Sequence, residues 1–263
     1  MRYFKRAIYS LLLIFFVLII WQYDLISYAL LMGYGQLKVL YHAAPAAEVL
    51  KDDSFPDSLK NKIQIVQQIR AFAFNSLGFH NSDNYTTVYD QKGKPILWVL
   101  TACLSYELKA KEWQFPILGS FSYKGFFDHE KALSEEEKLK NEGYDTDVSA
   151  AEGWSTLGWF NDPILSNMLL KTEGELASII IHELTHSMLY IKNDVDFNEN
   201  LANFVGDEGA VLFLEAKYGK ESNRYNDYVH SKADRAKFIK QILSGSIQLD
   251  SLYNLFKVWN GNS

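Results

Sequence analysis

The sequence predicts an α+β domain, with a small, mainly antiparallel sheet and several helices, behind an N-terminal transmembrane helix. Three observations predict this fold: an uncharged apolar run close to the N-terminus, strand-like segments gathered between residues 85 and 127, and two adjacent helical segments after residue 170. Strands that precede a pair of neighbouring helices are typical of α+β domains rather than of alternating βαβ units.

The composition indicates a folded chain that does not bind nucleic acid. Its 263 residues are 48% apolar, which is enough for a sizeable core and excludes general disorder. The net charge is -6, and no long basic run follows the extreme N-terminus, so nucleic acid is not expected as a partner. Cys103 is the single cysteine, which excludes an intramolecular disulfide and a cysteine-based zinc cluster.

Residues 1–33 are expected to be an N-terminal transmembrane anchor or uncleaved signal segment, followed by one domain over residues 34–263. Three positive side chains in MRYFKR precede an uncharged run from Ala7 to Ile20, which spans roughly 25 Å as a helix. The positive-inside rule then places the domain outside the cytoplasm. A cleaved signal peptide is the alternative, but no small-x-small cleavage site closes the run, so an uncleaved anchor is favoured.

The segments after the anchor are assigned from their periodicity. Residues 25–44 form a helix, and a second helix over residues 59–75 is capped by Asp57 or Ser58. Residues 85–90 and 96–104 are expected to pair as a hairpin across the turn QKGKP. Further strands are expected at 115–127 and 153–163, and further helices at 129–143, 173–191, 197–219, 231–245 and 249–260.

The stretch HELTH carries a candidate metal site. On a helix, His182 and His186 project from one face about one turn apart, so both can direct a ring nitrogen at one ion. Catalytic zinc commonly has three protein ligands and a water, and the adjacent Glu183 can act as general base. The alternative is a helix whose histidines only form hydrogen bonds. Apolar flanks bury this helix, so its histidines and glutamate need partners.

A third ligand is expected from the next helix, where three acids lie within reach along the sequence: Glu199, Glu208 and Glu215. We favour Glu199, which requires that the helix begins early, capped near Asn193 or Asp194. Glu208 would then lie roughly 13 Å further along the helix and out of reach of both imidazoles. Glu208 remains the alternative third ligand.

Several motifs resemble a known family. GQLKVL, WQFPILGSFSYKGFFD, GYDTDV, STLGWFNDPILS, HELTH and FNENLANFVGDEGA are similar to the bacterial family of predicted zinc aminopeptidases, over about Gln36 to Lys217. The resemblance implies a gluzincin-like, zincin-fold metallopeptidase domain whose HExxH helix packs on a glutamate-bearing helix. It implies His182, His186 and Glu199 as ligands of one zinc ion and Glu183 as catalytic base. The ligand spacing departs from the usual gluzincin pattern, in which the third ligand would fall at residue 205 or 206.

The expected function is therefore that of an exported, membrane-anchored zinc peptidase, an aminopeptidase by resemblance, in which Glu183 activates a zinc-bound water. The expected location is the bacterial inner or cytoplasmic membrane, with the catalytic domain outside. Two alternatives stay open: a non-catalytic exported zinc-binding module, and a zinc amidase acting on cell-wall peptides. Exo- and endopeptidase action are both compatible with the sequence.

Supporting roles have several candidates each. An oxyanion-stabilising group could come from Tyr225, Tyr228 or His230, although ordinary packing is the simpler reading of all three. A free α-amino group of the substrate would need a carboxylate near the metal, and the sequence offers Asp162, Glu173 and Glu175. The substrate backbone could pair with an edge strand over residues 156–160, which could equally be a core strand.

Overall fold

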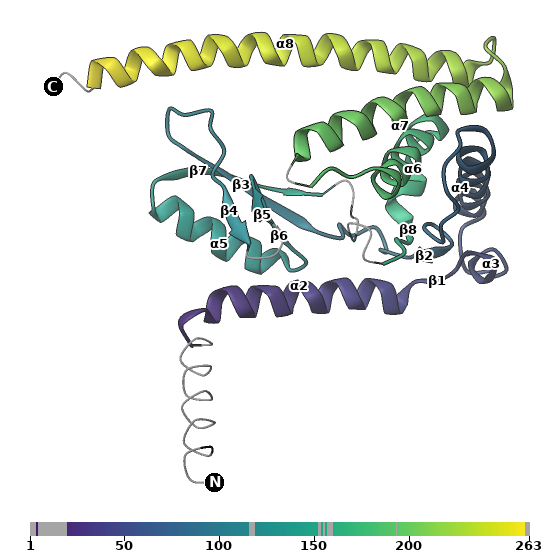
Figure 1. Ribbon diagram of the computed structural model, residues 1–263, viewed down its shortest axis with the longest axis horizontal. Coiled ribbons are helices and arrows are strands. Elements are labelled where there is room, and N and C mark those ends of the chain that lie inside the picture. The colour runs from purple at the N-terminus through teal and green to yellow at the C-terminus, as the bar shows by residue number, and fades with distance from the viewer. Residues whose placement is uncertain are drawn as a thin grey trace. The chain divides into compact units, whose positions relative to one another are not determined.

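The chain divides after Tyr41 into two compact units, Met1–Tyr41 and His42–Ser263. The structure is a computed structural model, shown as a ribbon in Figure 1. The first unit contains most of helix α2 (Tyr23–His42), so the boundary expected between residues 33 and 34 falls inside a continuous helix. The structure describes residues 4, 20–115, 119–151, 154, 156, 160–192 and 194–260, with 257–260 as backbone alone.

The expected transmembrane anchor lies mostly outside the described residues. Residues 1–3 and 5–19, which include nearly all of the apolar run, are not described. Within the part that is described, no helix is both long enough and apolar enough to cross a membrane. The anchor therefore stays a prediction.

The second unit is centred on three helices, α4 (Asp57–Ser76), α6 (Glu173–Met188) and α7 (Val195–Tyr218). Both α6 and α7 are covered on their apolar faces, as the helical period of their apolar residues predicts. Phe72 of α4 packs edge-to-face on Phe213 of α7, with ring centroids 5.7 Å apart. The side chains that this packing removes from water include Ile63, Val66, Ile69, Leu176, Ile180, Ile181, Leu184 and Leu214.

Within the described part of the chain, the strands form three small sheets instead of one. The first has the order β1 (Ala44–Pro45), β2 (Thr87–Tyr89), β8 (Ile164–Leu165), and only its β2–β8 pair is parallel. In the second, β3 (Trp98–Leu104) lies between β6 (Lys124–Phe126) and β7 (Tyr144–Ala150), with both pairs antiparallel. The third is the antiparallel pair β4 (Trp113–Phe115) and β5 (Gly119–Phe121). The α+β class and the mainly antiparallel pairing are thus observed.

Two strand predictions were wrong. The hairpin expected from residues 85–90 and 96–104 does not form, because β2 and β3 belong to different sheets. Of the last strand, expected at 153–163, the described residues 154, 156 and 160–163 belong to no strand; β7 precedes this segment and the two-residue β8 follows it. Thr156 and Phe160 are instead bonded to each other, because the hydroxyl of Thr156 donates to the Phe160 carbonyl at 2.8 Å.

The remaining helices differ in how well the sequence predicts them. Helix α5 (His129–Asn141) ends just before Gly143, which has a φ of 89°, as expected of a glycine stop. The segments 231–245 and 249–260, expected as two helices that close the core, form the single helix α8 (Asn223–Asn260). The helix runs on through Gly245, and many of its apolar side chains are exposed. The described residues of this unit also form helix α3 (Ala46–Val49) and a 3-10 turn (Ser166–Leu170).

Candidate metal centre

The helix that carries HELTH begins with a capping box. The hydroxyl of Thr172 accepts the Glu175 N–H, and the Glu175 carboxylate accepts the Thr172 N–H at 2.9 Å. These bonds satisfy backbone donors that a helix start leaves without partners. The rest of α6 buries an apolar face, so the helix presents His182, Glu183 and His186 from a rigid, firmly packed element.

The helix that carries Glu199 begins early, as predicted. Asp194 caps α7, and its carboxylate accepts the Phe197 N–H at 3.1 Å. The connection from α6 is held by Asn198, whose side chain bonds both backbone polar groups of Ile191 at 2.8 Å. Because this buried bridge shortens the path between the two helices, Glu199 reaches the histidines from the first turns of α7.

The three predicted ligands lie together. The Nε2 atoms of His182 and His186 are 3.1 Å apart, and each is 3.4 Å from a carboxylate oxygen of Glu199. Zinc–nitrogen bonds of about 2.0–2.1 Å place two ligand atoms of a tetrahedral site about 3.3 Å apart. The spacing of these donor atoms therefore matches a tetrahedral zinc site.

The environment of His186 also suits a metal. Burial lowers the pKa of His186, with a smaller contribution from His182, while Glu199 opposes the shift. A lowered pKa favours the neutral imidazole, which is the form that binds metals. The Nδ1 atom of His186 is buried and has no hydrogen-bond partner among the described residues. The Nε2 atoms of His182 and His186 point at each other and can share one proton at most. A cation bound between them would satisfy both nitrogens.

Glu183 lies beside the three ligands in a partly buried position. Burial raises the pKa of its carboxyl to about 8, and the charges of Asp162 and Glu199 add to the shift. A carboxyl group whose pKa lies close to neutrality can both take and return a proton at physiological pH. This environment would allow Glu183 to exchange a proton near neutral pH.

Two segments distant in sequence, which contain Tyr85 and Asp162, lie near Glu183. Buried Asp162 accepts the Thr156 N–H at 2.8 Å, and its own N–H donates to Asn84 Oδ1 at 2.9 Å. The Tyr85 N–H in turn donates to the Asp162 carbonyl at 2.7 Å. Tyr85 is fully buried with a φ of 61°, and burial and the charges of Glu183 and Asp162 raise the pKa of its phenol. A left-handed tyrosine at this position costs conformational energy, a cost often found at functional sites.

The alternative third ligands have other partners. The Glu208 carboxylate accepts a hydrogen bond from Lys232 Nζ of α8 at 2.6 Å. Glu215 lies 3.3 Å from Lys220 Nζ near the C-terminal end of α7. Glu199 is therefore the acid of α7 that the structure brings to the histidines.

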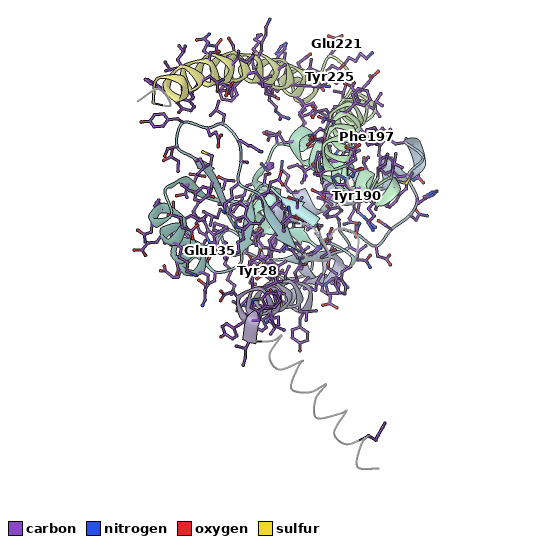
Figure 2. All side chains as sticks on the ribbon, turned by 60° about the vertical axis from the view of Figure 1, so that its left-hand side comes forward. Tyr28, Glu135, Tyr190, Phe197, Glu221 and Tyr225 are labelled. Carbon is purple, nitrogen blue, oxygen red and sulfur yellow. The ribbon has the colours of Figure 1, made fainter. Side chains whose placement is uncertain are left out.

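Most of the residues predicted to stabilise an oxyanion or to bind an amino group do not lie at the candidate metal centre. Tyr225 lies in the first turn of α8, near Glu221 in Figure 2. The hydroxyl of Tyr228 donates to Asp207 at 3.0 Å, and His230 is exposed on α8. Among the amino-group candidates only Asp162 lies near Glu183. Glu173 is bound by Tyr218, Lys217 and Arg224, and Glu175 belongs to the capping box.

A strand was predicted over residues 156–160 as a pairing partner for the substrate backbone. This prediction was wrong for the two ends of the segment, which the structure describes. Thr156 and Phe160 belong to no strand, and residues 157–159 lie outside the described part of the chain. The two ends are joined by hydrogen bonds through the Thr156 hydroxyl, which also accepts the Phe160 N–H at 3.1 Å.

Three tyrosines near the site were missed. Besides Tyr85, these are Tyr123, between β5 and β6, and Tyr190, just after α6. Burial raises the pKa of Tyr123, and the nearby Glu199 and Tyr190 add to the shift. The ring of Tyr190, labelled in Figure 2, lies edge-on to His186 with centroids 6.2 Å apart. Only Tyr190 could be found from the sequence, because it follows His186 by one helical turn.

Comparison with known proteins assigns the family. Residues 27–259 match the protein family described as "Putative aminopeptidase". The chain belongs to this family. Membership in this aminopeptidase family supports a peptidase and a peptide as the class of substrate. No curated protein and no solved structure matches the chain.

Proposed function

We propose that this protein is a zinc-dependent peptidase, in which His182, His186 and Glu199 hold one zinc ion and Glu183 is the general base. The observation that carries the proposal is the convergence of three donor atoms, 3.1 to 3.4 Å apart, beside a carboxyl group whose pKa is raised to about 8. Membership in an aminopeptidase family gives this arrangement its reaction, the hydrolysis of a peptide bond.

The ligand set suits zinc in particular. Two neutral imidazoles and one carboxylate are a combination found in catalytic zinc sites, which keep a fourth position for water or substrate. Glu199 is half exposed, at 51% of its side-chain surface, so the site is open on that side. Zinc, when bound, supplies Lewis-acid polarisation of a water and of the substrate carbonyl.

Glu183 moves the protons of the reaction. As a carboxylate it takes a proton from the attacking water, and as a carboxylic acid it gives that proton to the leaving amine. Burial makes both forms accessible near neutral pH, because it disfavours the charge that an exposed glutamate would keep. Asp162 is fixed by hydrogen bonds to Thr156 and Asn84, and its charge favours the protonated form of Glu183.

Action at the amino end of the substrate is part of the proposal. The family description supports it, and Asp162 supports it as a buried carboxylate near Glu183, where a free α-amino group could be attracted. Cleavage within a chain would need no such group, so the position of the cut bond decides between the two actions.

The test is zinc content and peptide hydrolysis of the purified full-length protein. Wild type, Glu183→Gln and Glu199→Ala are compared, with Glu208→Gln as the control for loss of an acid from α7. We expect about one zinc per chain in wild type, Glu183→Gln and Glu208→Gln, and less zinc in Glu199→Ala. We expect peptide hydrolysis by wild type and Glu208→Gln alone.

Two outcomes would contradict the proposal. Zinc at full content without hydrolysis of any peptide in a mixed library would indicate a non-catalytic zinc-binding module. Wild type without any metal would exclude the site itself. Release of free amino acids from the library would support aminopeptidase action, and internal fragments would contradict it.

We further propose that the protein is held in the bacterial cell envelope by its N-terminal segment, with the catalytic unit outside the cytoplasm. The support is the apolar run from Ala7 to Ile20 with positive side chains before it. Membrane fractionation and protease access in intact cells test this, and recovery of the protein in the soluble cytoplasmic fraction would contradict it.

A further inference from the structure

Tyr85 combines a left-handed backbone with a buried side chain. Its φ is 61°, and the residue is 2% exposed. Lys92 and Tyr106 also have a positive φ, but both are exposed. A bulky residue in this conformation costs conformational energy and persists only where the surrounding structure enforces it. The surroundings of Tyr85 therefore hold it in place against a cost.

Hydrogen bonds from two distant segments hold the backbone of Tyr85. Its carbonyl accepts a hydrogen bond from Gln67 Nε2 of α4 at 2.8 Å, and its N–H donates to the Asp162 carbonyl at 2.7 Å. Gln67 is held in turn by Arg70, whose Nη1 donates to Gln67 Oε1 at 2.7 Å. The direction in which the side chain leaves the backbone is thus fixed by α4 on one side and by the segment before α6 on the other.

The hydroxyl of Tyr85, in contrast, takes part in no hydrogen bond within the described part of the chain. A polar group on a buried side chain costs free energy when it gives up water without gaining a partner. Nearly all such groups are paired, so an exception calls for an explanation, and a role in catalysis is one. Both backbone polar groups of Tyr85 are paired, while the polar end of its side chain is left available.

This hydroxyl belongs to the surroundings of the candidate metal centre. The charges of Glu183 and Asp162 both act on the phenol, which therefore lies close to the two carboxyl groups. Glu183 in turn follows the ligand His182 directly and feels the charge of the ligand Glu199. No hydrogen bond among the described residues joins the Tyr85 hydroxyl to either carboxyl group, so the phenol is a neighbour of the base without being its partner.

The acidic neighbours of Tyr85 define what its hydroxyl can do. Burial and the charges of Glu183 and Asp162 raise the pKa of the phenol, so it stays protonated at neutral pH. Ionised carboxylates only accept hydrogen bonds, whereas a phenol can donate one. Addition of water to a peptide carbonyl makes the carbonyl oxygen negative, and a fixed donor stabilises that charge. Tyr85 supplies such a donor next to Glu183.

We propose that the Tyr85 hydroxyl donates a hydrogen bond to the carbonyl oxygen of the bond that is cut. This inference rests on the proposed peptidase function and assigns a further catalytic residue to that reaction. When the water activated by Glu183 adds to the carbonyl carbon, a C–O bond forms and the electron pair of the C=O double bond passes to the oxygen. The hydrogen bond from Tyr85 strengthens as this charge develops, which lowers the barrier.

The phenol keeps its proton throughout the reaction. When the intermediate collapses, the electron pair returns to the C=O bond, the C–N bond breaks, and the amine leaves with the proton that Glu183 carried. Tyr85 therefore releases the oxygen without any net transfer. Its fixed backbone explains how a donor can be aimed before the charge appears, because a preorganised donor needs no rearrangement during the reaction.

The test compares wild type with Tyr85→Phe in the full-length protein. Phenylalanine keeps the ring and lacks only the hydroxyl. We expect kcat for peptide hydrolysis to fall about 100- to 1000-fold, with KM little changed and zinc content unchanged. The urea midpoint of unfolding should stay the same or rise, because no protein group loses a hydrogen-bond partner.

Tyr228→Phe is the matched control. Tyr228 is also buried, at 4% exposure, but its hydroxyl donates to Asp207 at 3.0 Å. Loss of this bond should lower the urea midpoint, and kcat should stay unchanged, because Tyr228 contacts α7 away from the ligands. The two variants are therefore expected to show opposite patterns: activity lost with stability kept for Tyr85→Phe, and stability lost with activity kept for Tyr228→Phe.

A phosphinic peptide provides a second readout. Its tetrahedral phosphorus carries a charged oxygen where the carbonyl oxygen of a substrate becomes negative. In Tyr85→Phe its inhibition constant should rise by about the factor by which kcat/KM falls, while KM for the substrate changes little. A purely structural role of Tyr85 would instead weaken both ligands together or reduce the zinc content.

Three results with an active wild type would overturn the inference and leave the peptidase function in place. The first is an unchanged kcat in Tyr85→Phe. The second is a loss of kcat accompanied by an equal loss of zinc or by a lower urea midpoint. The third is a kcat that is lost in Tyr123→Phe and kept in Tyr85→Phe, which would assign the donor to the tyrosine near Glu199. A wild type that binds zinc and cuts no peptide would overturn the proposed function, and this inference with it.

Discussion

Gly206 of α7 lies directly against His182 of α6. A Cβ atom at Gly206 would lie 2.6 Å from the carbonyl oxygen of Ser178 and 3.1 Å from the Cβ atom of His182. Since the first of these neighbours is helix backbone, the missing side chain sets how closely α7 approaches the histidine helix. The position of Glu199 relative to His182 therefore depends on a glycine seven residues further along α7.

Gly206→Ala is expected to separate the two helices and weaken the metal centre. Relief of the overlap requires a shift of backbone, which typically costs about 1–3 kcal/mol in the free energy of unfolding. We also expect zinc affinity to fall, because His182 and Glu199 move apart. Urea unfolding and competition with a zinc chelator measure the two effects.

Gly245→Ala is the matched control, since nothing lies within 4 Å of a Cβ at Gly245 and the residue is inside α8. Alanine is favoured over glycine within a helix by about 0.5–1 kcal/mol, so this change should stabilise the protein slightly. Equal destabilisation by both changes would contradict the close approach at Gly206.

Glu199→Gln and Glu208→Gln are expected to differ in metal affinity and not in stability. Glu199 lies 3.4 Å from both imidazoles, whereas Glu208 pairs with Lys232 on a largely exposed surface. Loss of an exposed ion pair costs about 0–1 kcal/mol. Zinc titration should therefore show a large loss of affinity for Glu199→Gln alone, and a comparable loss for Glu208→Gln would contradict the ligand assignment.

The sequence predicts the placement of the three candidate ligands where their geometry is local. The spacing of His182 and His186 is a property of one helix, and the cap at Asp194 follows from residue type alone. Glu199 could be chosen over Glu208 because an early start of α7 leaves Glu208 too far along the axis.

The features that the sequence did not predict depend on distant segments. Val88 pairs with Ile164, and the Tyr85 N–H donates to the Asp162 carbonyl. The two residues of each pair lie far apart in the sequence, so no local pattern indicates either partner. The expected hairpin failed for the same reason, because strand pairing is decided by what covers each face. Gly245 suggested a helix end, but an isolated glycine lowers helix stability without ending a helix.

The stability of the metal-free protein is expected to fall between pH 5 and pH 8. Glu183 has a pKa raised to about 8 from 4.5, so in this interval the folded protein retains a proton that the unfolded chain has released. The folded state binds more protons, and the free energy of unfolding decreases as pH rises, by a few kcal/mol at most.

Urea unfolding of chelator-treated protein at several pH values measures this decrease. Glu183→Gln is the control, because glutamine does not titrate, and the difference between the two proteins isolates the contribution of Glu183. The same difference measured with zinc should be smaller, since a nearby cation favours the carboxylate. A difference that does not change with pH would contradict the raised pKa.

Asp162→Asn is expected to extend activity to lower pH. The negative charge of Asp162 contributes to the raised pKa of Glu183, and the substitution removes that charge while asparagine Oδ1 can still accept the Thr156 N–H. A lower pKa keeps Glu183 ionised at more acidic pH, so the acid limb of kcat/KM should shift to lower pH. Asp207→Asn is the control, because Asp207 bonds Ser178 and Tyr228 and does not contribute to the pKa shift of Glu183. An acid limb that stays in place in Asp162→Asn, or moves to higher pH, would show that another group limits the reaction.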